Sequence, residues 1–172
     1  LAIELARYPL KLVVGVDLCS PMVELGCQKV TALGLSHQVH LGLGDALNLP
    51  FPDSTFDSVT TAFTLRNVSN LSQALEEIRR VTRPGGRVVS LEITPGDRGL
   101  LPRLFHLGFQ RLVPILGSLV ARDRAAYTYL PNSVERFFSA AEVAKLMEKV
   151  GFQRVWYRRL ALGTVTIHVG EV

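Results

Sequence analysis

The sequence has little cysteine and no long run of charge. Its two cysteines, Cys19 and Cys27, form no CxxC motif, and we interpret them as reduced thiols on or near one helix. None of the four histidines has a partner at metal-ligand spacing, so no metal site is expected. Charged residues make up 20% and apolar residues 48% of the 172 residues, which excludes a disordered chain and predicts a folded core.

The net positive charge is small, and it is unevenly distributed along the chain. The net charge of the chain is +4. Residues 1–86 contain 7 Lys and Arg against 8 Asp and Glu, whereas residues 87–172 contain 12 against 7. This mild excess in the second half fits an anionic ligand or a membrane surface. Without a basic run it is too weak to indicate nucleic-acid binding.

Apolar stretches that alternate with helical patterns indicate an α/β fold. Strands are expected at 11–16, 38–43, 56–63 and 87–93, and helices at 20–33, 70–82 and 139–150. This alternation predicts a parallel, doubly wound sheet. Two last strands, 153–160 and 163–170, predict an antiparallel hairpin at the sheet edge. We expect one domain over residues 1–172.

Several helix ends and turns have clear local signals. Ser20 and Asn70 are expected N-caps, and Ser139 forms a capping box with Glu142. Pro-Gly-Gly at 84–86 predicts a tight turn before the next strand.

The apolar residues 100–121 interrupt the alternation of strands and helices. This run is long enough to span a bilayer, but it contains two prolines, two glycines and two arginines. We therefore predict that segment 98–138 is a helical insertion that covers an apolar pocket or lies at a membrane interface. Simple packing on the core remains the alternative.

Polar residues follow three of the predicted strands. Open α/β sheets bind ligands at the carboxyl ends of their strands. Asp17 can accept both hydroxyls of a ribose, and Asp45 can accept a hydrogen bond from an adenine amino group beside the small Ala46. The alternative for Asp17 is an ordinary solvated turn.

Arg66 and Asn67 follow the strand at 56–63. Arg66 is a planar, permanently charged donor suited to a developing oxyanion, and Asn67 can both donate and accept. The alternative for Arg66 is an ion pair with a surface carboxylate.

Six stretches in order along the chain resemble the ubiquinone/menaquinone biosynthesis C-methyltransferases, a branch of the class I S-adenosylmethionine-dependent methyltransferases. Leu-Arg-Asn-Val and Tyr-x-Tyr-Leu-Pro are more specific to this family than Pro-Gly-Gly, which many methyltransferases share. The matching stretches are residues 14–17, 44–53, 63–68, 80–87, 126–134 and 167–170.

The resemblance implies a fold, a reaction and a set of site residues. The fold is a Rossmann-like class I methyltransferase sheet, mostly parallel with an antiparallel C-terminal hairpin strand, in the order 3-2-1-4-5-7-6. The reaction moves a methyl group from S-adenosyl-L-methionine to a ring carbon of a polyprenyl quinol, either demethylmenaquinol or a ubiquinol precursor. The implied residues are Asp17, Asp45 and Ala46 for the cofactor, Arg66 and Asn67 for catalysis, and Tyr127 and Tyr129 for substrate binding.

The resemblance also implies a cytoplasmic enzyme peripheral to the membrane, with a homodimer left open. Ala62 stands where ubiquinone-type members often have Ser, which favours the menaquinone type. Family members have a first, central strand and a glycine-rich loop that would precede Leu1. We therefore expect an N-terminally truncated chain without these elements. Another small-molecule methyltransferase, or a non-catalytic fragment or scaffold subunit, remains an alternative.

Overall fold

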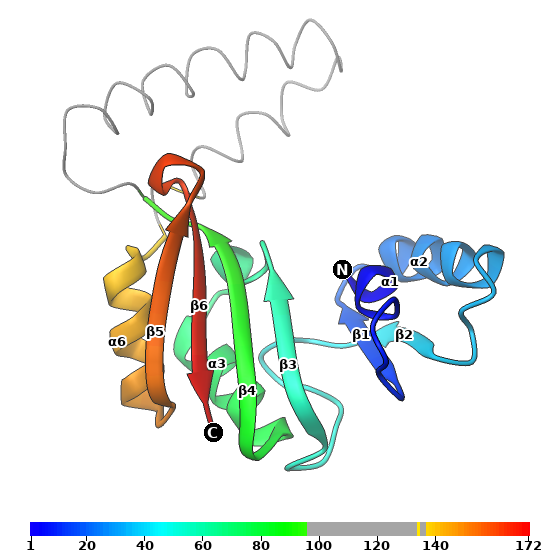
Figure 1. Ribbon diagram of the computed structural model, residues 1–172, viewed down its shortest axis with the longest axis horizontal. Helices are drawn as coiled ribbons and strands as arrows, with labels where there is room; N and C mark the ends of the chain where they lie inside the picture. The colour runs from blue at the N-terminus through cyan, green and yellow to red at the C-terminus, as the bar shows by residue number, and fades with distance from the viewer. Residues whose placement is uncertain (96–133, 135–136) are drawn as a thin grey trace, which may run out of the picture. The chain divides into compact units, whose positions relative to one another are not determined.

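The protein divides into two compact units, each described by itself. The computed structural model describes residues 1–95, 134 and 137–172. The first unit is Leu1–Pro52 and the second is Asp53–Val172. Figure 1 shows the helices and strands of both units coloured from the N-terminus to the C-terminus. Each unit contains a β-sheet with helices, which agrees with the predicted α/β class.

The first unit is built around a two-stranded parallel sheet. β1 pairs with β2 from Val13↔Val39 to Asp17↔Leu43. Val13, Val39 and Val30 form the buried core, because β-branched strand residues pack against one face of the following helix. The elements are α1 (Ala2–Leu5), β1 (Val13–Asp17), α2 (Ser20–Ala32) and β2 (Val39–Leu43).

The second unit is a four-stranded mixed sheet with two longer helices. The strand order is β3-β4-β6-β5, with β3 parallel to β4 and the other two pairs antiparallel. Figure 1 shows α3 and α6 on one face of this sheet, and Leu75, Val88 and Met147 are fully buried. The elements are β3 (Phe56–Ala62), η1 (Leu65–Asn67), α3 (Leu71–Val81), β4 (Thr82–Ile93), α6 (Ala140–Val150), β5 (Gln153–Leu160), η2 (Ala161–Gly163) and β6 (Val165–Glu171).

The strand order within each sheet agrees with the predicted class I order. β2-β1 corresponds to its first two positions, and β3-β4-β6-β5 corresponds to its last four. The described residues contain no strand that corresponds to the remaining position of that order. The predicted antiparallel hairpin is confirmed, and its first strand, β5, lies at the sheet edge.

The predicted N-cap of α2 is wrong by one residue. Cys19 is the N-cap, and Ser20 is the first helical residue, whose hydroxyl donates to Glu24 at 2.9 Å. The Cys19 N–H already donates to Asp17 Oδ1 at 2.9 Å. The strand-end carboxylate therefore sets the start of the helix, which a pattern based on Ser and Pro does not reveal.

The other two predicted caps are confirmed. Asn70 Oδ1 accepts the Gln73 N–H at 3.2 Å at the start of α3. Ser139 and Glu142 form a complete capping box at the start of α6. These local hydrogen bonds satisfy backbone donors that have no partner within the helix, so sequence alone locates them well.

The Pro-Gly-Gly stretch is a bulge inside a strand and not a turn before one. β4 already begins at Thr82, which pairs with Phe56, and the next pair is Ser58↔Arg87. The residues between Thr82 and Arg87 therefore form extra length in β4 against β3. A Cβ at Gly86 would lie 2.7 Å from the Arg83 carbonyl oxygen and 2.8 Å from that of Asp57. The close backbone approach explains why glycine occupies this position.

The edge strand β5 is rich in arginine. Its only partner strand in the described part of the chain is β6. Arg154 forms an ion pair with Glu171 of β6, while Arg158 is exposed and Arg159 is half-buried. Positive side chains therefore line the open edge of the sheet.

Candidate functional site

Asp17 and Asp45 lie at the carboxyl edge of the first unit's sheet. Asp17 ends β1, and Asp45 follows β2 by two residues. The strands are parallel, with Asp17 opposite Leu43, and the Gly44 N–H donates to the Asp17 carbonyl at 3.1 Å. The structure therefore brings together the two carboxylates that the sequence predicted for one ligand.

Each of these carboxylates makes a local turn bond with one oxygen. Asp17 Oδ1 accepts the Cys19 N–H, and Asp45 Oδ1 accepts the Leu47 N–H at 2.9 Å. Both residues are exposed, and neither Oδ2 has a hydrogen-bond partner among the described residues. The second oxygens can accept from a ribose diol and an adenine amino group, both of which donate. These two carboxylate acceptors fit the ribose hydroxyl and adenine amino donors of S-adenosylmethionine. The half-buried Ala46 follows Asp45 in the same loop.

Gly44 has a packing role next to Asp45. A Cβ there would lie 3.0 Å from Val16 Cβ and 3.2 Å from Pro50 Cδ. The glycine thus lets the loop after β2 pass close to the end of β1. This close approach accounts for the glycine at position 44.

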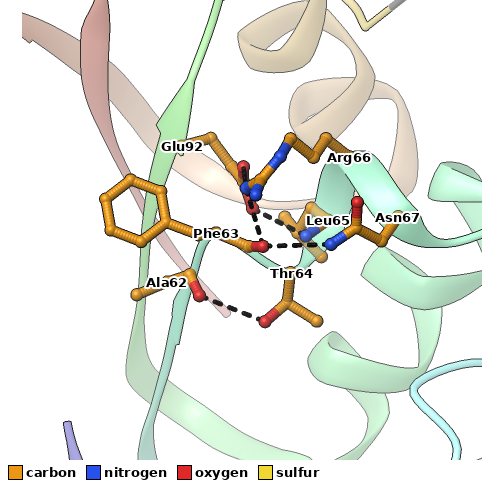
Figure 2. Close-up of polar contacts among 7 residues, drawn as sticks. All are labelled: Ala62, Phe63, Thr64, Leu65, Arg66, Asn67 and Glu92. Carbon is orange, nitrogen blue, oxygen red and sulfur yellow. Dashed lines mark hydrogen bonds and ion pairs between the residues drawn. The ribbon is translucent and has the colours of Figure 1, made fainter. Parts of the chain in front are cut away.

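Arg66 and Asn67 lie in a short 3₁₀ turn at the carboxyl end of β3. Between strand and turn, Phe63 adopts a left-handed backbone with φ of 58°. Its carbonyl accepts from Arg66 Nη1 at 2.7 Å and from Asn67 Nδ2 at 3.3 Å (Figure 2). A left-handed conformation costs a non-glycine residue about 1–2 kcal/mol. The two side chains predicted for catalysis therefore share one backbone acceptor.

Glu92 is the buried partner of Arg66 in this turn. Its side chain is 1% exposed, and Oε2 lies 3.2 Å from Arg66 Nη1. Oε1 accepts the Leu65 N–H at 2.6 Å (Figure 2). Burial raises the pKa of Glu92, while the Leu65 N–H and the charge of Arg66 oppose that rise. The predicted alternative is therefore correct that Arg66 pairs with a carboxylate, and wrong only about its location, because Glu92 is in the core and not on the surface.

The sequence prediction did not include Glu92 among the site residues. It lies in a strand that was expected from its β-branched and apolar residues, where it is the single acidic residue of β4. An acidic residue is seldom fully buried unless it is paired. That rule could have marked it, but the partner becomes known only when β3 and β4 are placed side by side.

Arg66 keeps some donors for a ligand. Nη1 serves both Phe63 and Glu92, whereas Nε is buried without a hydrogen-bond partner in the part of the chain that is described. The guanidinium carbon lies 5.8 Å from the centre of the Phe63 ring. Nε is out of reach of a ligand because it is buried, whereas Nη2 makes no hydrogen bond among the described residues and is the donor left for a substrate oxygen.

Tyr127 and Tyr129 lie outside the described residues, as does most of the predicted insertion 98–138. Their assignment to the substrate stays a prediction. In the part of the chain that is described, no helix is long and apolar enough to cross a membrane.

Solved structures that resemble this chain in fold include a methyltransferase and a cyclase. A SAM-dependent methyltransferase from Aquifex aeolicus has a TM-score of 0.66 and 23% identity, covering 98% of this chain and 73% of that one. The [4+2]-cyclase SpnF has a TM-score of 0.75 and 19% identity, covering 99% of this chain and 70% of that one. The strand order and these likenesses define a class I methyltransferase fold. The cyclase shows that this fold alone does not decide the reaction.

Sequence relatives identify the family. The ubiE/COQ5 methyltransferase family model matches residues 2–171. Demethylmenaquinone methyltransferases of Deinococcus radiodurans and Thermus thermophilus are 44% and 42% identical, covering 99% and 96% of this chain and 70% and 74% of those proteins. The mitochondrial 2-methoxy-6-polyprenyl-1,4-benzoquinol methylase of Bos taurus is 41% identical over 90% of this chain and 47% of that protein. The chain therefore belongs to the ubiE/COQ5 methyltransferase family and is an S-adenosylmethionine-dependent methyltransferase.

Proposed function

We propose that this chain methylates a ring carbon of a polyprenyl quinol in respiratory quinone biosynthesis. The relatives with this activity in their names act on demethylmenaquinone or on a benzoquinol. Ala62, the last residue of β3, favours the menaquinone type. The structural observation that carries the proposal is a guanidinium at the carboxyl end of β3 that Phe63 and Glu92 hold through Nη1, while Nη2 makes no hydrogen bond among the described residues.

The reaction requires a nucleophilic ring carbon. S-adenosylmethionine supplies a methyl group on a positively charged sulfur. A quinol ring carbon attacks this methyl group well only after the adjacent hydroxyl has lost its proton. With the methyl donor bound, the carbon–carbon bond would form as the sulfur–carbon bond breaks, which would leave S-adenosylhomocysteine. The ring carbon would then pass its proton to water to restore aromaticity.

Arg66 stabilises the phenolate oxygen in this proposal, and Asn67 orients the ring. Because Nη1 is already used and Nε is buried, Nη2 is the donor that meets the oxygen. A donor held in place before the reaction costs no reorganisation when charge develops. Asp17 and Asp45 hold the nucleoside with their free oxygens, so the chain contributes positioning and electrostatics.

Replacing Arg66 tests its role. We expect Arg66→Ala to lower kcat for demethylmenaquinol about 10²–10³-fold, because one preorganised oxyanion donor contributes about 2.7–4 kcal/mol. Methyl transfer is measured with radiolabelled S-adenosylmethionine and a short-chain quinol, after a thermal melt has shown that the variant folds. Arg83→Ala is the matched control, since Arg83 pairs with exposed Asp57 in the same unit.

Two outcomes would contradict the proposal. If Arg66→Ala turns over within about twofold of the wild type, the assigned donor is wrong. If the wild type binds S-adenosylmethionine but methylates neither demethylmenaquinol nor a benzoquinol precursor, another acceptor is the substrate.

A polyprenyl quinol is a lipid, so the proposed substrate resides in a membrane. We propose a cytoplasmic protein that meets its polyprenyl quinol at the membrane surface. The arginine-rich part of segment 98–138, on which the sequence places this contact, lies outside the described residues. A homodimer stays a prediction.

A further inference from the structure

We propose that Glu92 is the positioning residue of this site: its carboxylate holds both the backbone and the guanidinium of the Leu65–Arg66 turn in the orientation that meets the substrate oxygen. The inference rests on the proposed function of Arg66. Glu92 itself is 1% exposed and does not touch the substrate.

The two oxygens of Glu92 fix two different parts of the turn. Oε1 accepts the Leu65 backbone N–H at 2.6 Å, and Oε2 meets the Arg66 side chain at 3.2 Å. Glu92 comes from β4, which pairs with β3 along most of its length. The turn is therefore fixed to the neighbouring strand, and Figure 2 shows the Glu92 side chain pointing toward Leu65 and Arg66.

Burial shields the contact between Glu92 and Arg66 from water. The Arg66 side chain is 11% exposed and that of Glu92 is 1% exposed, so water competes little with the pair. A buried carboxylate must be paired, and here it is met by the Leu65 N–H and the Arg66 guanidinium. The pair is neutral overall, so Arg66 acts through the direction of its remaining donors more than through net charge.

Glu92 also helps to hold the guanidinium that binds the strained Phe63 backbone. Phe63 has φ of 58°, and its carbonyl accepts from Arg66 Nη1. Such conformations persist only when the surroundings over-determine them. Arg66 Nη1 binds both the Phe63 carbonyl and Glu92, so losing the carboxylate frees the guanidinium to rotate away from its working position.

The first test compares Glu92→Gln with Glu92→Asp. Gln keeps the size and an acceptor for Leu65 but loses the charge, so we expect kcat to fall about 100-fold through misplacement of Arg66. The affinity for S-adenosylmethionine should stay within twofold. Glu92→Asp restores the charge and should recover part of kcat. Glu171→Gln is the matched control, because Glu171 pairs with Arg87 near the middle of β4 and with Arg154 of β5, away from the Leu65–Arg66 turn.

The second test is a double-mutant cycle of activity. If Glu92 acts through Arg66, the double variant Arg66→Gln/Glu92→Gln has the same kcat as Arg66→Gln alone. Losses that multiply would overturn the inference and would leave Glu92 a general stability residue. If Glu92→Gln does not fold, the double variant, which buries no charge, is still compared with Arg66→Gln.

The third test needs no quinol and separates this inference from the proposed function. The free energy of unfolding is measured for the same four proteins in urea. We expect each single variant to be less stable than the double variant, because each leaves one buried charge without its partner. Additive stabilities would overturn the Glu92–Arg66 coupling. A wild type that shows this coupling but methylates no quinol would instead refute the proposed function alone.

Discussion

The buried histidine of β6 should make the second unit sensitive to acid. His168 has 0% exposure, and its Nε2 lies 2.8 Å from the Ala140 carbonyl oxygen, to which it donates when the imidazole is neutral. Nδ1 is buried without a partner in the described part of the protein. Tyr157 packs against the ring, and Arg159 lies close enough to disfavour a second positive charge. Burial, with that charge, lowers the pKa of His168.

The sign and size of the effect follow from this lowered pKa. The unfolded chain takes up the proton near pH 6.5, whereas the folded chain does so only at lower pH. The unfolded state therefore binds more protons below pH 6.5, and stability falls as pH falls. Each pH unit corresponds to at most about 1.36 kcal/mol per proton, so we expect a loss of stability between pH 7.5 and pH 5.0 that does not exceed about 2 kcal/mol.

The assay is urea unfolding of the wild type and His168→Gln at both pH values. The single tryptophan, Trp156, reports on this unit because it pairs with Val169 beside His168. Gln keeps a donor for Ala140 but takes up no proton. Glu92 has a raised pKa, so its contribution to stability changes with pH in the opposite direction. This contribution is the same in the wild type and in His168→Gln, and it cancels when their stabilities are compared. An equal loss in both proteins would refute the reasoning, and His40→Gln, at an exposed histidine, is the control.

Two further predictions concern stability. Gly86→Ala should destabilise the protein by about 1–3 kcal/mol, because its Cβ would overlap the carbonyls of Arg83 and Asp57. A thermal melt measures this loss, and an unchanged midpoint would show that the bulge at 83–86 can shift to make room for the Cβ. Ser139→Ala should cost about 1 kcal/mol through loss of the capping box of α6, measured by urea unfolding. A Ser139→Asp variant that is as weak as the alanine variant would contradict that explanation.

Local signals predicted most of the fold, and tertiary contacts account for the differences. The capping box at Ser139 and the last hairpin depend on neighbouring residues, and both are confirmed. The bulge at 83–86 depends on how β4 pairs with β3, so Pro-Gly-Gly alone predicted a turn. The start of α2 depends on a carboxylate at the end of the preceding strand, which the Ser-Pro pattern does not contain.

The site was predictable where chain order determines it. Parallel strands place their ends at one edge, so Asp17 and Asp45 could be paired before the structure was known. Glu92 could not be assigned to Arg66 in the same way. The two residues are far apart in sequence, and their contact depends on the register of β3 with β4 and on the left-handed Phe63.

The arginines of β5 have a consequence for the behaviour of the protein at high concentration. An open strand edge is a template for pairing with the same strand of another molecule, which leads to aggregation. In the antiparallel register that places Arg154 of one β5 strand opposite Arg158 of another, two arginine–arginine pairs would form. The strand contains no acidic residue, and Glu171 of β6 is the acidic partner of Arg154. Like charges placed opposite one another disfavour such pairing. The arginines of β5 would therefore disfavour self-association of two β5 strands.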